Sequence, residues 1–135
     1  MRPDEKLLSS GLFLSERDSC LALWRVKGVG AKTYLRLLEV FSSAKAVFAS
    51  SVEGLKQAGL SPQTAANIKN FDSSLIEPDR QWLKKEACHV MCWQDDDYPT
   101  LLREISDPPP VLIIRGDRSL LSSLQLAIVG TRKPS

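Results

Sequence analysis

Apolar residues in the first half of the chain recur every three or four positions, which is the spacing of amphipathic helices. Serine stands just before several of these stretches, where its hydroxyl can accept a hydrogen bond from a free amide of the first helical turn. The pattern therefore predicts a series of short helices. Their predicted starts are Ser15, Ser43, Ser50, which forms a capping box with Glu53, and Ser61, which is followed by Pro62.

Glycines mark where these helices end. Gly28-Val29-Gly30 separates the first helix from the second, and Gly59 ends the short helix that begins after Ser50. A longer helix is predicted from about Leu75 to Ala87, with Pro78 near its beginning. The first part of the chain is therefore expected to be all-helical.

After Ala87 the pattern changes to short apolar runs of strand-forming residues. A turn at Asp95–Pro99 is predicted to lead into a short helix around Leu101. The last two apolar runs have no polar face, which is typical of a parallel sheet covered by helices. The predicted strands are Cys88–Trp93, Val111–Ile114 and Leu126–Val129.

We therefore expect an α+α/β chain with two main parts. Residues 1–14 are predicted to form an N-terminal arm, residues 15–80 a helical domain, and residues 81–135 the first strands of a doubly wound α/β domain. In such a fold a helix should follow the turn after the last strand, and here the chain stops. We expect the chain to be the N-terminal part of a longer protein, truncated within its second domain.

Composition narrows the class of protein. The 135 residues are 43% hydrophobic and 25% charged, as in folded globular proteins, and a net charge of +2 does not by itself indicate a nucleic-acid partner. No apolar run is long enough for a membrane helix, and the N-terminus lacks a signal-peptide pattern. Three cysteines without disulfide spacing favour a reducing, cytoplasmic location.

The hairpin between the first two helices is a candidate backbone-phosphate site. Its sequence follows the helix-hairpin-helix pattern, in which free amides at the start of the second helix can hold a phosphate. The stretch from Arg25 to Arg36 contains no acid, so the hairpin is locally basic. The candidate residues are Lys27, Gly28, Gly30 and Lys32.

This hairpin departs from the usual pattern at two positions. Lys27 stands where proline is usual, and Tyr34 stands where alanine is usual. A weaker second copy is predicted at Val52–Ile68, with Gly59-Leu60-Ser61 as its hairpin. For both copies, helix packing without nucleic-acid contact stays open as an alternative.

A second candidate site lies at the end of the last predicted strand. Gly130, Thr131, Arg132 and Lys133 follow this strand at its carboxyl end, where open α/β sheets bind ligands. Glycine permits a close backbone approach, and arginine can hold a phosphate through two parallel N–H bonds. We expect a phosphate-bearing ligand here, either a nucleotide or a nucleic acid. Pairing of Arg132 with a carboxylate is the alternative.

The cysteines, the histidine and the acidic run are expected to have structural roles. Strand alternation places Cys88 and Cys92 on one face and His89 on the other, so we expect buried thiols rather than a metal site. The run Asp95–Asp97 is interpreted as a solvated turn and helix cap, with cation binding as the alternative. We identify no catalytic residues and no cofactor or metal site.

Five motifs follow one another between residues 15 and 135. They are Trp24…Gly28-Val29-Gly30, Asp97-Tyr98-Pro99-x-Leu101, Ile105-Ser106-Asp107-Pro108-Pro109, Val111-Leu112-x-x-Arg115-Gly116-Asp117 and Ala127-Ile128-Val129-Gly130-Thr131-Arg132. In this order they resemble the bacterial DNA-processing family DprA, also called Smf.

The resemblance implies a SAM-like or helix-hairpin-helix domain followed by an extended Rossmann domain. It implies a cytoplasmic recombination mediator of natural transformation, which binds incoming single-stranded DNA and loads RecA, and which is not an enzyme. The family's DNA-pocket arginine corresponds to Arg132, with Gly130 and Thr131 shaping the turn. The surfaces for self-association and RecA would lie mainly beyond Ser135.

Three other functions stay open at this stage. The helical domain could bind duplex DNA through the first hairpin, or it could be a protein-interaction module. The α/β part could instead belong to a nucleotide-binding Rossmann enzyme whose catalytic residues lie beyond Ser135.

Overall fold

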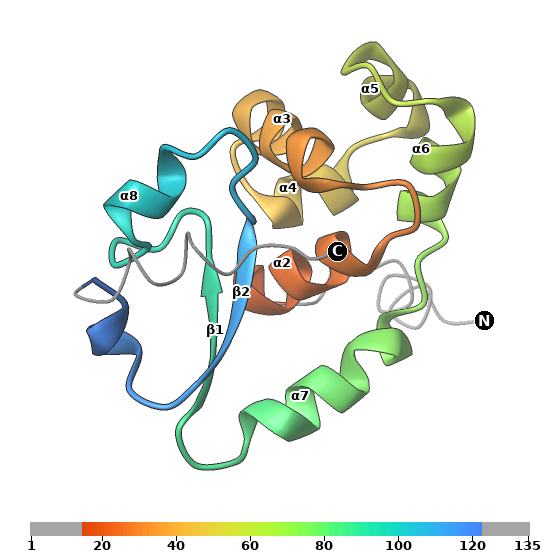
Figure 1. Ribbon diagram of the computed structural model, residues 1–135. Coiled ribbons are helices and arrows are strands. Elements are labelled where there is room, and N and C mark those ends of the chain that lie inside the picture. The colour runs from red at the N-terminus through yellow and green to blue at the C-terminus, as the bar shows by residue number, and fades with distance from the viewer. Residues whose placement is uncertain (1–14, 123–135) are drawn as a thin grey trace, which may run out of the picture.

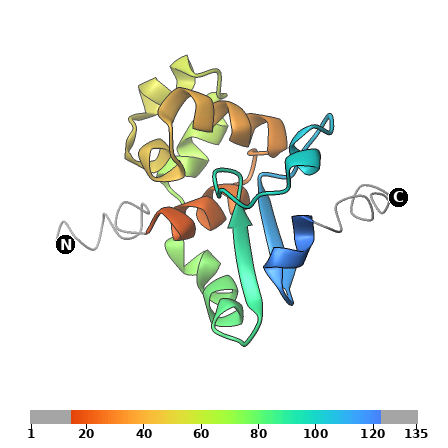
Figure 2. The ribbon, with the colours of Figure 1, turned by 90° about the vertical axis from the view of Figure 1, so that its left-hand side faces the viewer.

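The computed structural model describes residues 15–122 (Figure 1). In both views α3–α6 lie above the first helix, α2, while α7 lies below it and the two strands lie beside it (Figures 1 and 2). The helices are α2 (Glu16–Arg25), α3 (Ala31–Phe41), α4 (Ala44–Ala49), α5 (Val52–Gln57), α6 (Pro62–Lys69), α7 (Glu77–Leu83) and α8 (Thr100–Arg103). The strands are β1 (Cys88–Cys92) and β2 (Val111–Arg115), and the 3₁₀ helices are η1 (Ser73–Ile76) and η2 (Arg118–Ser122).

Three helices begin at the serine N-caps that the sequence predicts. The hydroxyls of Ser15, Ser43 and Ser61 each accept a hydrogen bond from the amide three residues later, at 3.0–3.1 Å. Pro62 occupies the first turn of α6, as expected. These starts are predictable because each cap satisfies a free amide within its own turn.

Two predicted helix boundaries are wrong. The cap of α5 is Ser51, which accepts from the Gly54 amide at 3.0 Å, whereas the Ser50 hydroxyl donates to the Val47 carbonyl and closes α4. The helix predicted to reach Ala87 is split into η1 and α7, and α7 ends at Leu83. Ala87 has a φ of +60°, so the chain has left helical geometry before β1 begins.

The strands β1 and β2 pair in antiparallel register, with Val90 opposite Ile113 and Cys92 opposite Val111. The predicted strands at Cys88 and Val111 are therefore confirmed, and so is the short helix around Leu101. The parallel pairing expected for the two later runs involves Leu126–Val129, which lies outside the described residues. The SAM-like, helix-hairpin-helix and Rossmann assignments, and the boundary near residue 80, stay predictions.

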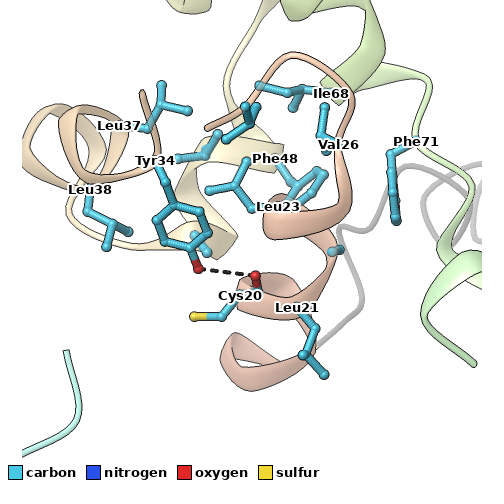
Figure 3. Close-up of a cluster of buried hydrophobic side chains, with 14 of the residues drawn as sticks. Cys20, Leu21, Leu23, Val26, Tyr34, Leu37, Leu38, Phe48, Ile68 and Phe71 are labelled. Atoms are coloured by element: carbon cyan, nitrogen blue, oxygen red, sulfur yellow. Dashed lines mark hydrogen bonds between the residues drawn. The ribbon is translucent and has the colours of Figure 1, made fainter. Parts of the chain in front are cut away.

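The main hydrophobic core lies around α2, where side chains from α2, α3, α4 and α6 meet (Figure 3). Tyr34 and Phe48, both fully buried, share this cluster with Val90 of β1 and Val111 of β2. Met91 faces the other way, into a smaller cluster with Tyr98 and Leu102. Both faces of β1 are thus covered, and this packing fixes α2 and the hairpin that follows it.

Candidate nucleic-acid interface

The first hairpin is anchored to the core by two valines. Val26 ends α2 and Val29 lies inside the hairpin, and both are buried. The Val29 amide donates to the Val26 carbonyl at 3.2 Å, which closes the turn. The residues between and after these anchors, Lys27, Gly28 and Gly30, are exposed.

The start of α3 has no side-chain cap. Gly30 is the N-cap residue, and neither a capping hydroxyl nor an acidic residue lies in the first turn. Within residues 15–122, the side chains of Lys27 and Lys32 form no hydrogen bond or ion pair. Free amides, the positive end of the helix dipole and two unpaired cations together make a site where a phosphate can bind.

The second hairpin differs from the first in the number of free amides at the start of the helix that follows it. Leu60 is buried in the place that Val29 has in the first hairpin, but the first turn of α6 has fewer free amides than that of α3. Ser61 caps the Thr64 amide at 3.1 Å, and Pro62 has no N–H to offer. The second hairpin therefore retains fewer free donors, which favours packing as its role.

The two hairpins pack against each other's following helix. Gly28 has a φ of +99°, and a Cβ there would lie 2.6 Å from Oγ1 of Thr64 in α6. Gly59 has a φ of +105°, and a Cβ there would lie 2.9 Å from Nη1 of Arg36 in α3. The Asn67 side-chain amide also donates to the Lys27 carbonyl at 2.9 Å. These reciprocal contacts hold the first hairpin in position.

Arg25 forms an ion pair with Asp79 of α7 instead of adding its charge to the hairpin. Its guanidinium donates to both oxygens of Asp79, at 2.8 and 2.6 Å, and this pairing raises the pKa of Arg25. The expected basic stretch from Arg25 to Arg36 therefore loses its first member. The remaining cations are Lys27, Lys32 and Arg36, all of which are exposed.

The cysteines have the burial that the sequence predicts. Cys20, Cys88 and Cys92 are free thiols and all are buried, while His89 is partly buried. Among the residues that the structure describes, no group of His, Cys, Asp and Glu side chains is placed to hold a metal ion.

The acidic run forms a turn, and an arginine that the sequence analysis does not identify pairs with it. Asp95 accepts from the Cys92 amide at 2.9 Å, so it caps the turn after β1 rather than a helix. Arg118 donates to both oxygens of Asp97 at 2.9 Å and lowers the pKa of that carboxyl. This ion pair ties η2 to the turn and occupies the carboxylate that a cation would need.

The second candidate site is the predicted turn after the last strand. Gly130, Thr131, Arg132 and Lys133 lie outside the described residues, and their predicted roles stay predictions. Thr64 and Asn67, which hold the first hairpin from α6, were not identified from the sequence. The only signal for them is the internal similarity of the two hairpins, because both residues lie in the helix that follows the second copy.

Three comparisons with known proteins bear on the identity of this fold. Residues 89–135 match the model of the family described as DNA recombination-mediator protein A. The chain is 33% identical over 81 residues to Protein Smf of Escherichia coli (strain K12), which is 60% of this chain and 22% of Smf. It is 45% identical over 55 residues to UvrABC system protein C of Ligilactobacillus salivarius (strain UCC118), which is 41% of this chain and 9% of that protein.

These matches cover limited parts of the longer relatives. The chain spans about a fifth of the length of Smf, since the match covers 22% of it. No solved structure matches the chain. Over the described residues, no helix has the length and apolar character needed to cross a membrane.

Proposed function

This chain belongs to the DprA/Smf family, and from that premise we propose that it is the N-terminal part of a DNA recombination mediator that binds single-stranded DNA and loads RecA. Its role would be to hold DNA and present it to a recombinase in the cytoplasm, without catalysing a reaction itself. Self-association would depend on the α/β part that continues beyond Ser135.

The main support for this proposal is that the family match includes the second candidate site. Residues 89–135 include the segment Gly130-Thr131-Arg132-Lys133, which the sequence predicts to be a turn and in which a glycine, a hydroxyl and two cations follow an apolar run. An arginine can hold a backbone phosphate with two parallel N–H bonds, and the glycine lets the strand approach closely. The proposed DNA contact is therefore mainly electrostatic, so its affinity should fall as salt increases.

Replacing Arg132 with alanine in the longer protein should weaken single-stranded DNA binding about tenfold and reduce the salt dependence of the affinity. Fluorescence anisotropy of a labelled oligonucleotide at two salt concentrations measures both quantities. Arg115→Ala is the matched control, because Arg115 is an exposed arginine at the end of β2, outside the proposed turn. An Arg132→Ala variant with unchanged affinity and salt dependence would rule out this role.

A second function is supported by the first hairpin. The uncapped start of α3, flanked by the unpaired side chains of Lys27 and Lys32, suits the phosphate backbone of duplex DNA. If this hairpin binds DNA, residues 1–135 alone should bind duplex DNA without the rest of the α/β domain. If the helical part is instead a protein-interaction module, this chain should bind neither duplex nor single strands.

The double variant Lys27→Glu, Lys32→Glu should lower duplex affinity by about tenfold or more, since two phosphate contacts become repulsive. Anisotropy of labelled duplex and single-stranded DNA measures this change. Lys56→Glu is the control, because Lys56 lies in α5 before the second hairpin and already pairs with Glu53 at 3.5 Å. Equal losses in the control and the double variant would indicate a nonspecific charge effect rather than a hairpin site.

A further inference from the structure

Two cysteines from distant parts of the chain meet at the contact between α2 and β1. Cys20 lies in the middle of α2, and Cys92 is the last residue of β1. Both are members of the main core, with exposed fractions of 4% and 5%. Both also line one cavity of about 220 Å³, whose other lining residues are Glu16, Arg17, Gln94 and Asp95.

We propose that Cys20 and Cys92 are a redox-active thiol pair that closes reversibly into a disulfide between α2 and β1. The third cysteine, Cys88, lies at the other end of β1 and lines a different cavity, together with His89 and Leu83. The fold therefore places two of the three thiols together and keeps the third apart. The shared cavity gives a small oxidant access to the pair.

The surroundings assign different roles to the two sulfurs. The adjacent Cys20 thiol lowers the pKa of Cys92, and the Arg17 cation acts in the same direction, while burial, Asp95 and Glu16 oppose them. The pKa of Cys20 is raised, because the adjacent Cys92 sulfur and the burial of Cys20 both favour the protonated thiol. A thiolate is the attacking species in thiol–disulfide exchange, so Cys92 attacks first and Cys20 resolves.

The oxidant is a small disulfide, and the exchange balances in two steps. The Cys92 thiolate attacks one sulfur of the small disulfide, forms a mixed disulfide and releases one small thiol. Cys20 then attacks the Cys92 sulfur, the mixed S–S bond breaks, and the second small thiol leaves. The Cys20 Sγ donates to Glu16 Oε2 at 3.5 Å, so this carboxylate can accept the Cys20 proton and pass it to the leaving thiolate. The protein thiols lose two electrons and two protons, and the small disulfide gains them as it becomes two small thiols.

Closing this bond would change the stability of the whole fold. The disulfide would enclose α3 to α7, because these helices lie between Cys20 and Cys92 in the chain. A loop of this length loses much conformational freedom in the unfolded state, so the oxidised protein should unfold at a temperature about 10 °C higher. In a reducing cytoplasm such a bond would form only under oxidative stress and would open again afterwards.

The test is to incubate the protein with oxidised glutathione and to map its peptides without reduction. We expect the number of free thiols, counted under denaturing conditions, to fall from three to one, and we expect a linked peptide pair containing Cys20 and Cys92. Cys88→Ser should give the same linked pair and should retain no free thiol after oxidation. Treatment with dithiothreitol should restore the thiols and the original unfolding temperature.

Several results would overturn the proposal. They are a wild-type protein that retains three free thiols, one that carries only glutathione adducts, and one whose linked peptides contain Cys88. Cys20→Ser and Cys92→Ser should each lose the linked pair and the thermal shift. The wild-type peptide map is decisive even where one of these variants folds poorly, because it needs no substitution.

Discussion

Replacing Gly28 with alanine should lower the free energy of unfolding by about 3 kcal/mol. Two costs combine at this position. The φ of +99° is strained for any residue with a side chain, and the new Cβ would lie 2.6 Å from Thr64 Oγ1 and 3.4 Å from Thr64 Cβ. The 2.6 Å approach to Oγ1 is closer than any real Cβ contact, so either the Thr64 side chain or the hairpin must shift. Denaturant titration followed by circular dichroism measures the loss.

Gly30→Ala is the matched control in the same hairpin. Gly30 has a φ of −94°, and no atom lies within 4 Å of the position its Cβ would take. Alanine there should cost less than about 1 kcal/mol, mainly because it is a poor N-cap residue. Adding Thr64→Ala to Gly28→Ala should recover part of the larger loss by removing the steric cost. If both glycine variants lost equal stability, the close approach of the hairpin to α6 would be contradicted.

The two glycines therefore have different roles in the hairpin. Gly28 is explained by the close packing of the hairpin against α6, whether or not DNA binds there. Gly30 has open space around it and begins α3 without a side-chain cap, so a phosphate could approach its amide. The phosphate hypothesis thus rests on Gly30 and the neighbouring lysines rather than on the glycine pattern as a whole.

Features that depend on neighbouring residues could be predicted from the sequence. Ser15, Ser43 and Ser61 were identified because a cap and the amide it satisfies are three residues apart. Ser50 was wrongly preferred to Ser51, since the Ser50–Glu53 spacing fits a capping box. In the structure the Ser50 hydroxyl bonds to the preceding helix, so the next serine is left to cap α5.

Features that depend on distant residues could not be predicted in this way. The sequence places Arg25 in the basic stretch of the hairpin, but in the structure its guanidinium pairs with both carboxylate oxygens of Asp79 in α7. The early end of α7 has a similar origin, because the Gly116 amide donates to the Ala87 carbonyl at 2.6 Å and brings this segment beside β2. The sequence identified the hairpin as a candidate site, but only the fold shows which of its charges are unpaired.

Replacing Tyr34 with alanine should lower the free energy of unfolding by about 4 kcal/mol. The Tyr34 side chain is fully buried in the main core, and its ring meets Trp24 edge-on with 5.8 Å between ring centroids. Truncation would leave a large cavity between α2 and α3, which the helices cannot close without moving the hairpin. Denaturant titration with the slope held in common between variants measures this loss.

Tyr34→Phe separates the ring from the hydroxyl. The hydroxyl donates to the Cys20 carbonyl at 3.1 Å, and a single neutral hydrogen bond of this kind contributes about 1 kcal/mol. Phenylalanine should therefore retain most of the stability that alanine loses. Ala65 occupies the matching place in the second hairpin and is also fully buried, so the pattern's usual alanine suits that copy. If Tyr34→Ala were no more costly than Tyr34→Phe, the first hairpin would accept the usual small residue, and the role of Tyr34 in holding α3 against α2 would be refuted.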